Sequence, residues 1–134
     1  MIPALLNTSL LALLSAAVPL SMTFAATVLA VTPPGDIIRD PSAQDASTAT
    51  SLHALAISSK GHLLLNESQG RFDFDTWEKV HEKAMSICQG AQVKGEDGDI
   101  AMAEDVEGQP LQSFIRETVE DHMHRDYAWK IDAA

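Results

Sequence analysis

Histidine and carboxylate side chains gather near the C-terminus, in a pattern that could be taken for a metal site. The candidates are Glu117, Glu120, Asp121, His122 and His124. On a helix, residues two positions apart point to different sides, whereas ligands of one ion lie three or four apart. The Glu120 and His124 pair has that spacing but supplies only two ligands, which do not complete a site. The sequence therefore predicts no metal site here.

Other reactive side chains are better explained by structural roles. His53 and His62 fall on neighbouring predicted strands and could approach each other across a hairpin. Cys88 lies on the apolar side of a predicted helix, where a thiol behaves as a small hydrophobic group with a raised pKa. Asp40 and Asp45 share a loop, but two isolated carboxylates rarely hold Mg²⁺ without phosphate ligands. We expect no catalytic residue and no cofactor from these positions.

Three basic residues form the one candidate contact site for RNA. Arg39, Lys60 and Arg71 fall at predicted strand ends and turns, where they could form a small basic edge at the rim of a sheet. Exposed basic residues at turns are also ordinary. Both interpretations of these residues stay open.

Length, charge and cysteine content limit the classes of protein to which this chain could belong. The chain has 134 residues, enough for one domain with a modest core. Its net charge of −10, with nine Lys and Arg, disfavours autonomous nucleic-acid binding. A single cysteine allows no internal disulfide, which favours a reducing, intracellular compartment.

The apolar stretch from Met1 to Val31 has two interpretations. It could be a membrane anchor or a signal peptide, since the first charged side chain is Asp36. No basic flank precedes it, however, and Pro19 divides it. Leu and Ala dominate before Pro19, whereas Thr, Val and Phe dominate after it. We therefore expect a buried helix followed by a buried strand, with a small membrane-anchored protein as the alternative.

Helical and strand patterns alternate along the chain. A helix is expected over residues 3–18, an interior strand over 21–32, a turn at 33–35 and a short antiparallel partner over 36–39. Residues 40–50 have loop chemistry, and strands are expected over 51–58 and 62–66, joined by a turn at 59–61.

The second half combines two helices with an acidic segment. Asp75, with Glu78 three residues later, is expected to cap a helix that ends near Gly90. Its apolar stripe consists of Trp77, Val80, Ala84, Ile87 and Cys88. Residues 94–108 hold six carboxylates against one lysine, as in a solvated, flexible insertion. A last amphipathic helix is expected after Pro110, with an apolar side formed by Leu111, Phe114, Ile115, Val119 and Met123.

This order of elements predicts an α+β fold, with a small antiparallel sheet packed against helices on one face. Because the chain begins inside an all-apolar helix, we expect an uncovered helix face and an unpaired sheet edge, as in a truncated domain.

Four segments resemble RNase PH-like proteins, in the same order. Residues 7–20 read NTSLLALLSAAVPL, which is similar to the family's N-A-x-x-L-A-L-x-x-A-G-I-P helix. The other three are DIIRDP at 36–41, SLHALA at 51–56 and LLLNESQG at 63–70 with Phe72. The resemblance covers residues 3 to about 90 and implies the C-terminal half of an RNase PH-like domain (ribosomal protein S5 domain 2-like). Residues 1–90 would form that part, residues 91–109 the acidic flexible insertion, and residues 110–134 the C-terminal helix and tail.

The resemblance also implies the absence of catalysis. Active members carry two aspartates six residues apart, and here Asp45 stands at the first position but Ser51 at the second. A hydroxyl cannot replace a carboxylate in holding a divalent cation. The family's phosphate-binding arginines belong to the half of the domain that this sequence lacks. An active phosphate-dependent 3′ to 5′ exoribonuclease, completed by a partner, is the alternative.

The family points to a ring subunit of the eukaryotic RNA exosome. The resemblance implies a non-catalytic, structural role that supports 3′ to 5′ processing of ribosomal RNA and decay of messenger RNA. Expected partners are other RNase PH-like ring subunits and RNA-binding cap subunits, with RNA met only inside the assembled ring and no membrane. The expected location is the nucleus and nucleolus, and also the cytoplasm.

Overall fold

The protein is described by a computed structural model over residues 1–90 and 110–131. The expected acidic insertion at 91–109 lies outside these residues. The helices are α1 (Ile2–Ser15), α2 (Ala43–Thr48), α3 (Phe74–Gln89) and α4 (Leu111–Ile131). The strands are β1 (Phe24–Val31), β2 (Ile37–Arg39), β3 (Ser51–Ser58) and β4 (Leu63–Gly70).

The strands form one antiparallel sheet in the order β2-β1-β3-β4. β1 is interior, as its apolar faces predicted, and pairs with β3 from Phe24↔Ser58 to Val31↔Ser51. The expected turn and short partner strand are confirmed by β2. β4 is longer than predicted, since it continues to Gly70. A register shift between Ala56 and Ile57 leaves Leu64 without an opposite residue.

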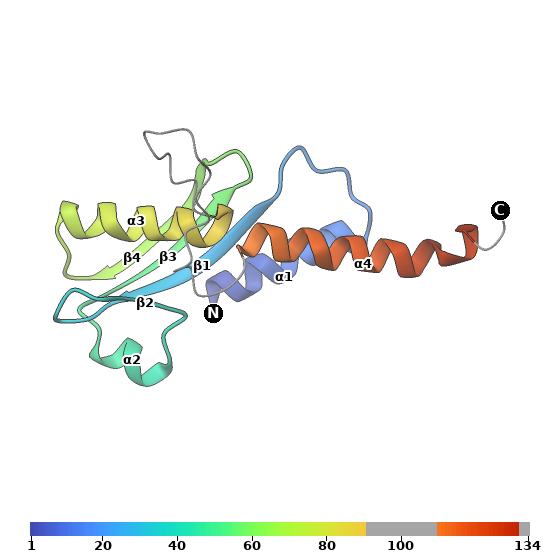
Figure 1. Ribbon diagram of the computed structural model, residues 1–134. Coiled ribbons are helices and arrows are strands. Elements are labelled where there is room, and N and C mark those ends of the chain that lie inside the picture. The colour runs from blue at the N-terminus through green and yellow to red at the C-terminus, as the bar shows by residue number, and fades with distance from the viewer. Residues whose placement is uncertain (91–109, 132–134) are drawn as a thin grey trace, which may run out of the picture.

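Helices α1, α3 and α4 share one face of the sheet (Figure 1). Residues of α1, α3 and α4 cluster with Ala25, Leu29 and Val31 of β1 and with Leu55 and Ile57 of β3. The register places these strand residues on one side, because Ala25 lies opposite Ile57 and Leu29 opposite His53. The expected α+β fold, with a small antiparallel sheet packed against helices, is therefore observed.

Helix α1 ends three residues earlier than predicted, at a left-handed alanine. Ala17 has φ 54°, its N–H donates to Leu14 O, and the N–H of Val18 donates to Leu13 O. This is the pattern of a Schellman cap, which favours glycine. The RNase PH-like pattern reads glycine at the position of Ala17, and an alanine there costs about 1–2 kcal/mol.

Asn7 ties α1 to the edge of β1. Its side-chain amide donates to Ala26 O and accepts from Ala26 N, each at 2.8 Å. β2 pairs only with residues 29–31 of β1, so it does not reach Ala26. The amide therefore satisfies backbone groups that a neighbouring strand would otherwise bind.

The prediction of a loop over residues 40–50 was wrong, because α2 lies within it. Ser42 caps this six-residue helix and exchanges hydrogen bonds with Asp45 in a capping box. No residue of α2 is buried. The helix therefore has none of the apolar periodicity on which the prediction depended.

The predicted cap of α3 was also wrong. Asp73, not Asp75, is the cap, and its Oδ1 accepts from Thr76 N at 2.9 Å. The predicted stripe is confirmed at Val80, Ala84, Ile87 and Cys88, which are all buried. Trp77 is only half-buried.

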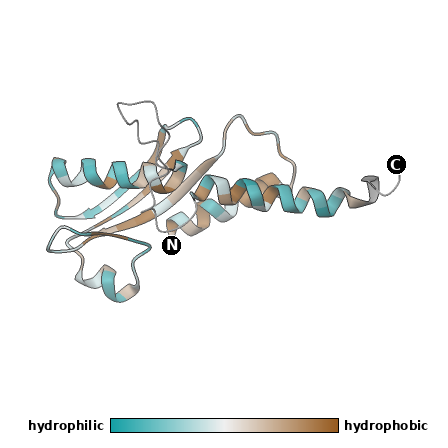
Figure 2. Ribbon diagram, viewed as in Figure 1, coloured by the Kyte–Doolittle hydropathy of each residue, from teal (hydrophilic) through white to brown (hydrophobic). Residues whose placement is uncertain are grey.

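The last helix, α4, is present, but less of it packs than predicted. Ile115 is buried, and Leu111 and Val119 are half-buried, whereas Phe114 is 52% and Met123 54% exposed. Figure 2 shows a mostly hydrophilic distal part of α4, and Figure 1 shows that it extends past the sheet. None of the helices within residues 1–90 and 110–131 has the length and hydropathy needed to cross a bilayer.

Candidate functional site

The three basic residues proposed as an RNA contact do not lie together. Arg39 ends β2, and its Nε lies 3.3 Å from Asp40 Oδ2. Lys60 lies in the β3–β4 turn, whereas Arg71 follows β4 and donates its N–H to Thr50 O. An eight-residue strand separates the two ends by about 23 Å. Lys60 and Arg71 thus belong to opposite ends of the sheet, and contact of any of the three with RNA stays a prediction.

The position of the first family aspartate is occupied by a structural side chain. The Asp45 carboxylate accepts hydrogen bonds from Ser42 N at 3.1 Å and Ser42 Oγ at 2.7 Å. These bonds to the Ser42 side chain and backbone lower the pKa of Asp45. Asp45 therefore stabilises the start of α2.

At the position of the second family aspartate, Ser51 places a buried hydroxyl. Ser51 is 2% exposed, and its Oγ lies 3.0 Å from His53 Nε2. On the other side of the ring, His53 Nδ1 lies 2.8 Å from Ser68 Oγ, which donates to Asn66 Oδ1 at 2.9 Å. Because the Ser68 hydroxyl donates to Asn66, His53 donates to Ser68 from Nδ1. Burial lowers the pKa of His53 and so favours the neutral ring, in which Nε2 accepts from the Ser51 hydroxyl.

This serine–histidine pair resembles a nucleophile and its base, but it is inaccessible. His53 is fully buried, its ring meets Phe72 edge to face at 4.8 Å, and burial lowers its pKa. His62 lies in the hairpin turn, at the far end of β3, so the two histidines do not meet. The pair satisfies buried polar atoms and has no open side for a substrate.

Cys88 is buried, as its place on the apolar stripe of α3 predicted, whereas the two C-terminal histidines are exposed. Burial raises the pKa of the Cys88 thiol to about 12, and its Sγ donates to Ala25 O at 3.5 Å. His122 and His124 are exposed on α4. Among residues 1–90 and 110–131, no group of three or more His, Cys, Asp or Glu side chains could hold a metal ion.

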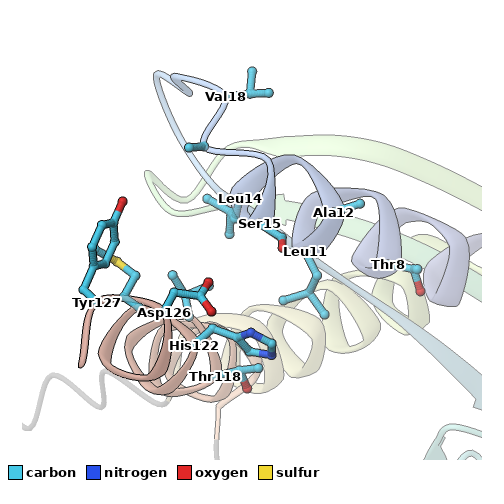
Figure 3. A pocket seen from close by; sticks show the side chains of 13 residues that line it. Thr8, Leu11, Ala12, Leu14, Ser15, Val18, Thr118, His122, Asp126 and Tyr127 are labelled. Atoms are coloured by element: carbon cyan, nitrogen blue, oxygen red, sulfur yellow. The ribbon is translucent and has the colours of Figure 1, made fainter. Parts of the chain in front are cut away.

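A largely apolar groove lies between α1 and α4, and we call it the α1/α4 groove (Figure 3). It has a volume of about 670 Å³. Figure 3 shows Leu11 and Leu14 of α1 facing His122 and Asp126 of α4. Its apolar lining is contributed by Leu11, Leu14, Val18, Val119, Met123 and Tyr127.

The groove exists because the two helices contact each other only in part. α4 reaches the core through Ile115, whereas all side chains from Glu120 to Ala128 are exposed. Val18 is 41% and Tyr127 48% exposed. Tyr127 was not predicted as part of a site, although Val119, Met123 and Tyr127 recur every four residues. An apolar side chain of a partner could fill such a groove.

A second open feature is the outer edge of the sheet. Within the described residues β4 pairs with β3 alone, so one side of its backbone has no strand beside it. Leu63 and Leu64, at its start, are 37% and 51% exposed. The expected unpaired edge is therefore present, and it could accept a strand from another chain.

Comparison with known proteins supports the fold. No protein-family model and no curated protein sequence matches this chain. Among solved structures it is similar to the crystal structure of Rrp46 from rice (Oryza sativa), with 21% identity and a TM-score of 0.59. The match covers 63% of this chain and 40% of the rice chain. The chain thus has the fold of part of an RNase PH-like domain, as the sequence resemblance implied. That resemblance is in particular to ribosomal RNA-processing protein 46, and the match to Rrp46 agrees with it.

Proposed function

We propose that this chain is a non-catalytic structural subunit of the RNA exosome ring. The observation that carries the proposal is the fold it shares with rice Rrp46. In this role it would support 3′ to 5′ RNA processing and degradation, including rRNA processing and mRNA decay. The compartments would be the nucleus and nucleolus, and also the cytoplasm.

Its open surfaces support a role in assembly. The α1/α4 groove and the edge of β4 both present apolar side chains that the described residues leave exposed. Such surfaces are typical of contacts between subunits. Partners would be other RNase PH-like ring subunits and RNA-binding cap subunits. With a net charge of −10, the chain would meet RNA only inside the assembled ring.

The buried Ser51 supports the absence of catalysis. Phosphorolysis in the family is implied to need carboxylates at positions 45 and 51. Ser51 offers no carboxylate, and its hydroxyl is buried against His53. Asp45 is engaged in the cap of α2.

Purification of the tagged chain from its own cells tests the assembly. We expect it to co-purify in constant ratio with RNase PH-like proteins, in a particle of ring size. A point substitution in the groove, Leu11→Asp, should release the chain from the particle, because it buries an unpaired charge at the contact. Leu64→Asp is the matched variant at the β4 edge. Recovery of wild-type chain as a lone monomer, with no RNase PH-like protein, would refute the proposal.

The active alternative has its own test. In a purified particle, Asp45→Asn should leave phosphate-dependent release of nucleoside diphosphates from RNA unchanged, because Asp45 does not contribute to catalysis. Asp36→Asn, an exposed residue of the β1–β2 turn, is the control. A drop of tenfold or more with Asp45→Asn alone would favour an active exoribonuclease.

A further inference from the structure

Three aromatic rings stack along α3. The rings of Phe74 and Trp77 are 6.2 Å apart at 28°, and those of Trp77 and His81 are 5.2 Å apart at 16°. Spacings of three and four residues place them in one row on the helix. Phe74 ends the row and is 72% exposed. We call these three residues the aromatic row.

A shallow acidic hollow lies beside the aromatic row. It has a volume of about 650 Å³ and is lined by Asp75, Glu78, Lys79, His81, Glu82 and Met85. His81 belongs to both features, so the row and the hollow are continuous. In the part of the chain that the structure describes, Asp75, Glu78 and Glu82 make no ion pair within 4.0 Å. Three carboxylates against one lysine leave this surface negative.

We propose that the aromatic row and the acidic hollow together bind an arginine-containing basic segment of a protein partner. A planar guanidinium extends a stack of rings by lying on the open ring of Phe74. Its N–H groups can then donate to the neighbouring carboxylates. A lysine ammonium satisfies the charge but does not extend the stack, so it fits this surface less well.

Charge decides against RNA as the occupant. Single-stranded nucleic acid also stacks its bases on aromatic side chains. Each nucleotide, however, would bring a phosphate close to the three carboxylates of a chain with net charge −10. A basic peptide is attracted by the same field that repels the phosphates. This inference does not depend on the proposal that the chain belongs to an exosome ring.

Fluorescence of Trp77 in the full-length chain tests the proposal. The sequence holds two tryptophans, so Trp129→Phe makes Trp77 the single reporter. The probes are an alternating glycine–arginine peptide, the corresponding glycine–lysine peptide and a short uridine homopolymer. We expect the arginine peptide to change the emission of Trp77, to bind about twofold to fivefold more tightly than the lysine peptide, and to weaken as salt rises.

Two independent variants separate the ring contact from the charge. Phe74→Ala should weaken binding of the arginine peptide about twofold to fivefold. The double change Glu78→Gln with Glu82→Gln should weaken it by about the same factor and reduce its dependence on salt. Phe114→Ala and Glu67→Gln are matched controls on α4 and β4, and neither should alter the affinity.

The changes at Phe74, Glu78, Glu82, Phe114 and Glu67 affect exposed side chains, so these variants are expected to fold. Circular dichroism verifies the fold of every variant. Unchanged affinity in both the Phe74 and the Glu78/Glu82 variants would overturn the proposal. Tighter binding of the uridine homopolymer than of the arginine peptide would also overturn it, and would identify the row as a platform for nucleic acid.

Discussion

The two ends of the molecule use the same kinds of apolar side chain but differ in how far they bury them. In the sheet core, formed by β1, β3 and α3, the side chains of Leu29, Leu55 and Val80 are fully buried. At the open end, formed by α1 and α4, Val18 is 41% and Met123 54% exposed. Composition does not separate these regions, because both are rich in aliphatic residues. They differ in whether a second layer of structure covers them. A partner that covered the open end would bury apolar surface there and so stabilise the folded chain.

The largest expected effect comes from breaking the sheet core. Leu55→Ala should lower the free energy of unfolding by about 2–5 kcal/mol, because it leaves a cavity in a fully buried position. The same change at the open end, Leu5→Ala, removes a side chain that is 64% exposed and should cost under about 0.5 kcal/mol. Urea denaturation of both variants measures the contrast. Equal losses would show that α1 is covered in solution.

A smaller loss is expected where β4 approaches β3. Gly70 has φ 101°, and a Cβ there would meet the Thr50 carbonyl oxygen. Gly70→Ala should therefore cost about 1–3 kcal/mol in the free energy of unfolding. Gly35 also has a positive φ, but nothing lies within 4 Å of the position a Cβ would take. Gly35→Ala therefore measures the cost of the backbone conformation without the steric clash. Equal costs for the two variants would show that the strand ends relax without penalty.

Acid should weaken the sheet core through His53. Burial lowers the pKa of this histidine from its usual 6.5, so below that pH the unfolded chain takes up a proton that the folded chain does not. The contribution of His53 to stability is therefore constant above about pH 6.5 and declines as the pH falls below it. Denaturation of the wild type and of His53→Gln across this range should show a steeper decline in the wild type. Parallel curves would contradict the assignment of a buried, neutral ring.

The smallest effect expected is a gain at the open end. Ala17→Gly should raise the free energy of unfolding by about 1 kcal/mol, because glycine adopts φ 54° without the clash of a Cβ. The neighbouring change Ala16→Gly is the control, since Ala16 has φ −77° and gains nothing from glycine. A gain with Ala16→Gly and none with Ala17→Gly would contradict the observed cap of α1.

Pattern and resemblance predicted the sheet core better than the open end. β1 was predicted as an interior strand because both of its faces are apolar, and the structure buries residues on both faces of β1 and β3, such as Leu29 with Ala30 and Leu55 with Ala56. The short helix α2 was missed because its stability comes from the Ser42–Asp45 hydrogen bonds and not from burial. At α3 the capping-box spacing to Glu78 favoured Asp75, whereas the geometry of the turn makes Asp73 the cap.

The candidate sites depended on tertiary distances that the sequence does not contain. Arg39, Lys60 and Arg71 all lie at strand ends, but strand direction puts Lys60 at the end opposite Arg71. In the α1/α4 groove, apolar spacing alone indicated neither that the side chains of α4 are exposed from Glu120 onward nor that Tyr127 lines the groove. Phe74, Trp77 and His81 have helical spacing in the sequence, which is enough to predict the aromatic row. The predicted apolar stripe instead assigned Trp77 to the buried side of α3.

The hydrogen bonds between Asn7 and Ala26 report whether α1 is packed against the sheet. The Ala26 amide proton is held by a side chain of α1 and not by a strand, so any event that lifts or tilts the helix exposes that proton to solvent. Binding of a partner that holds α1 against the sheet would then slow hydrogen exchange at the Ala26 amide, even if the exchange rates in the rest of the sheet did not change.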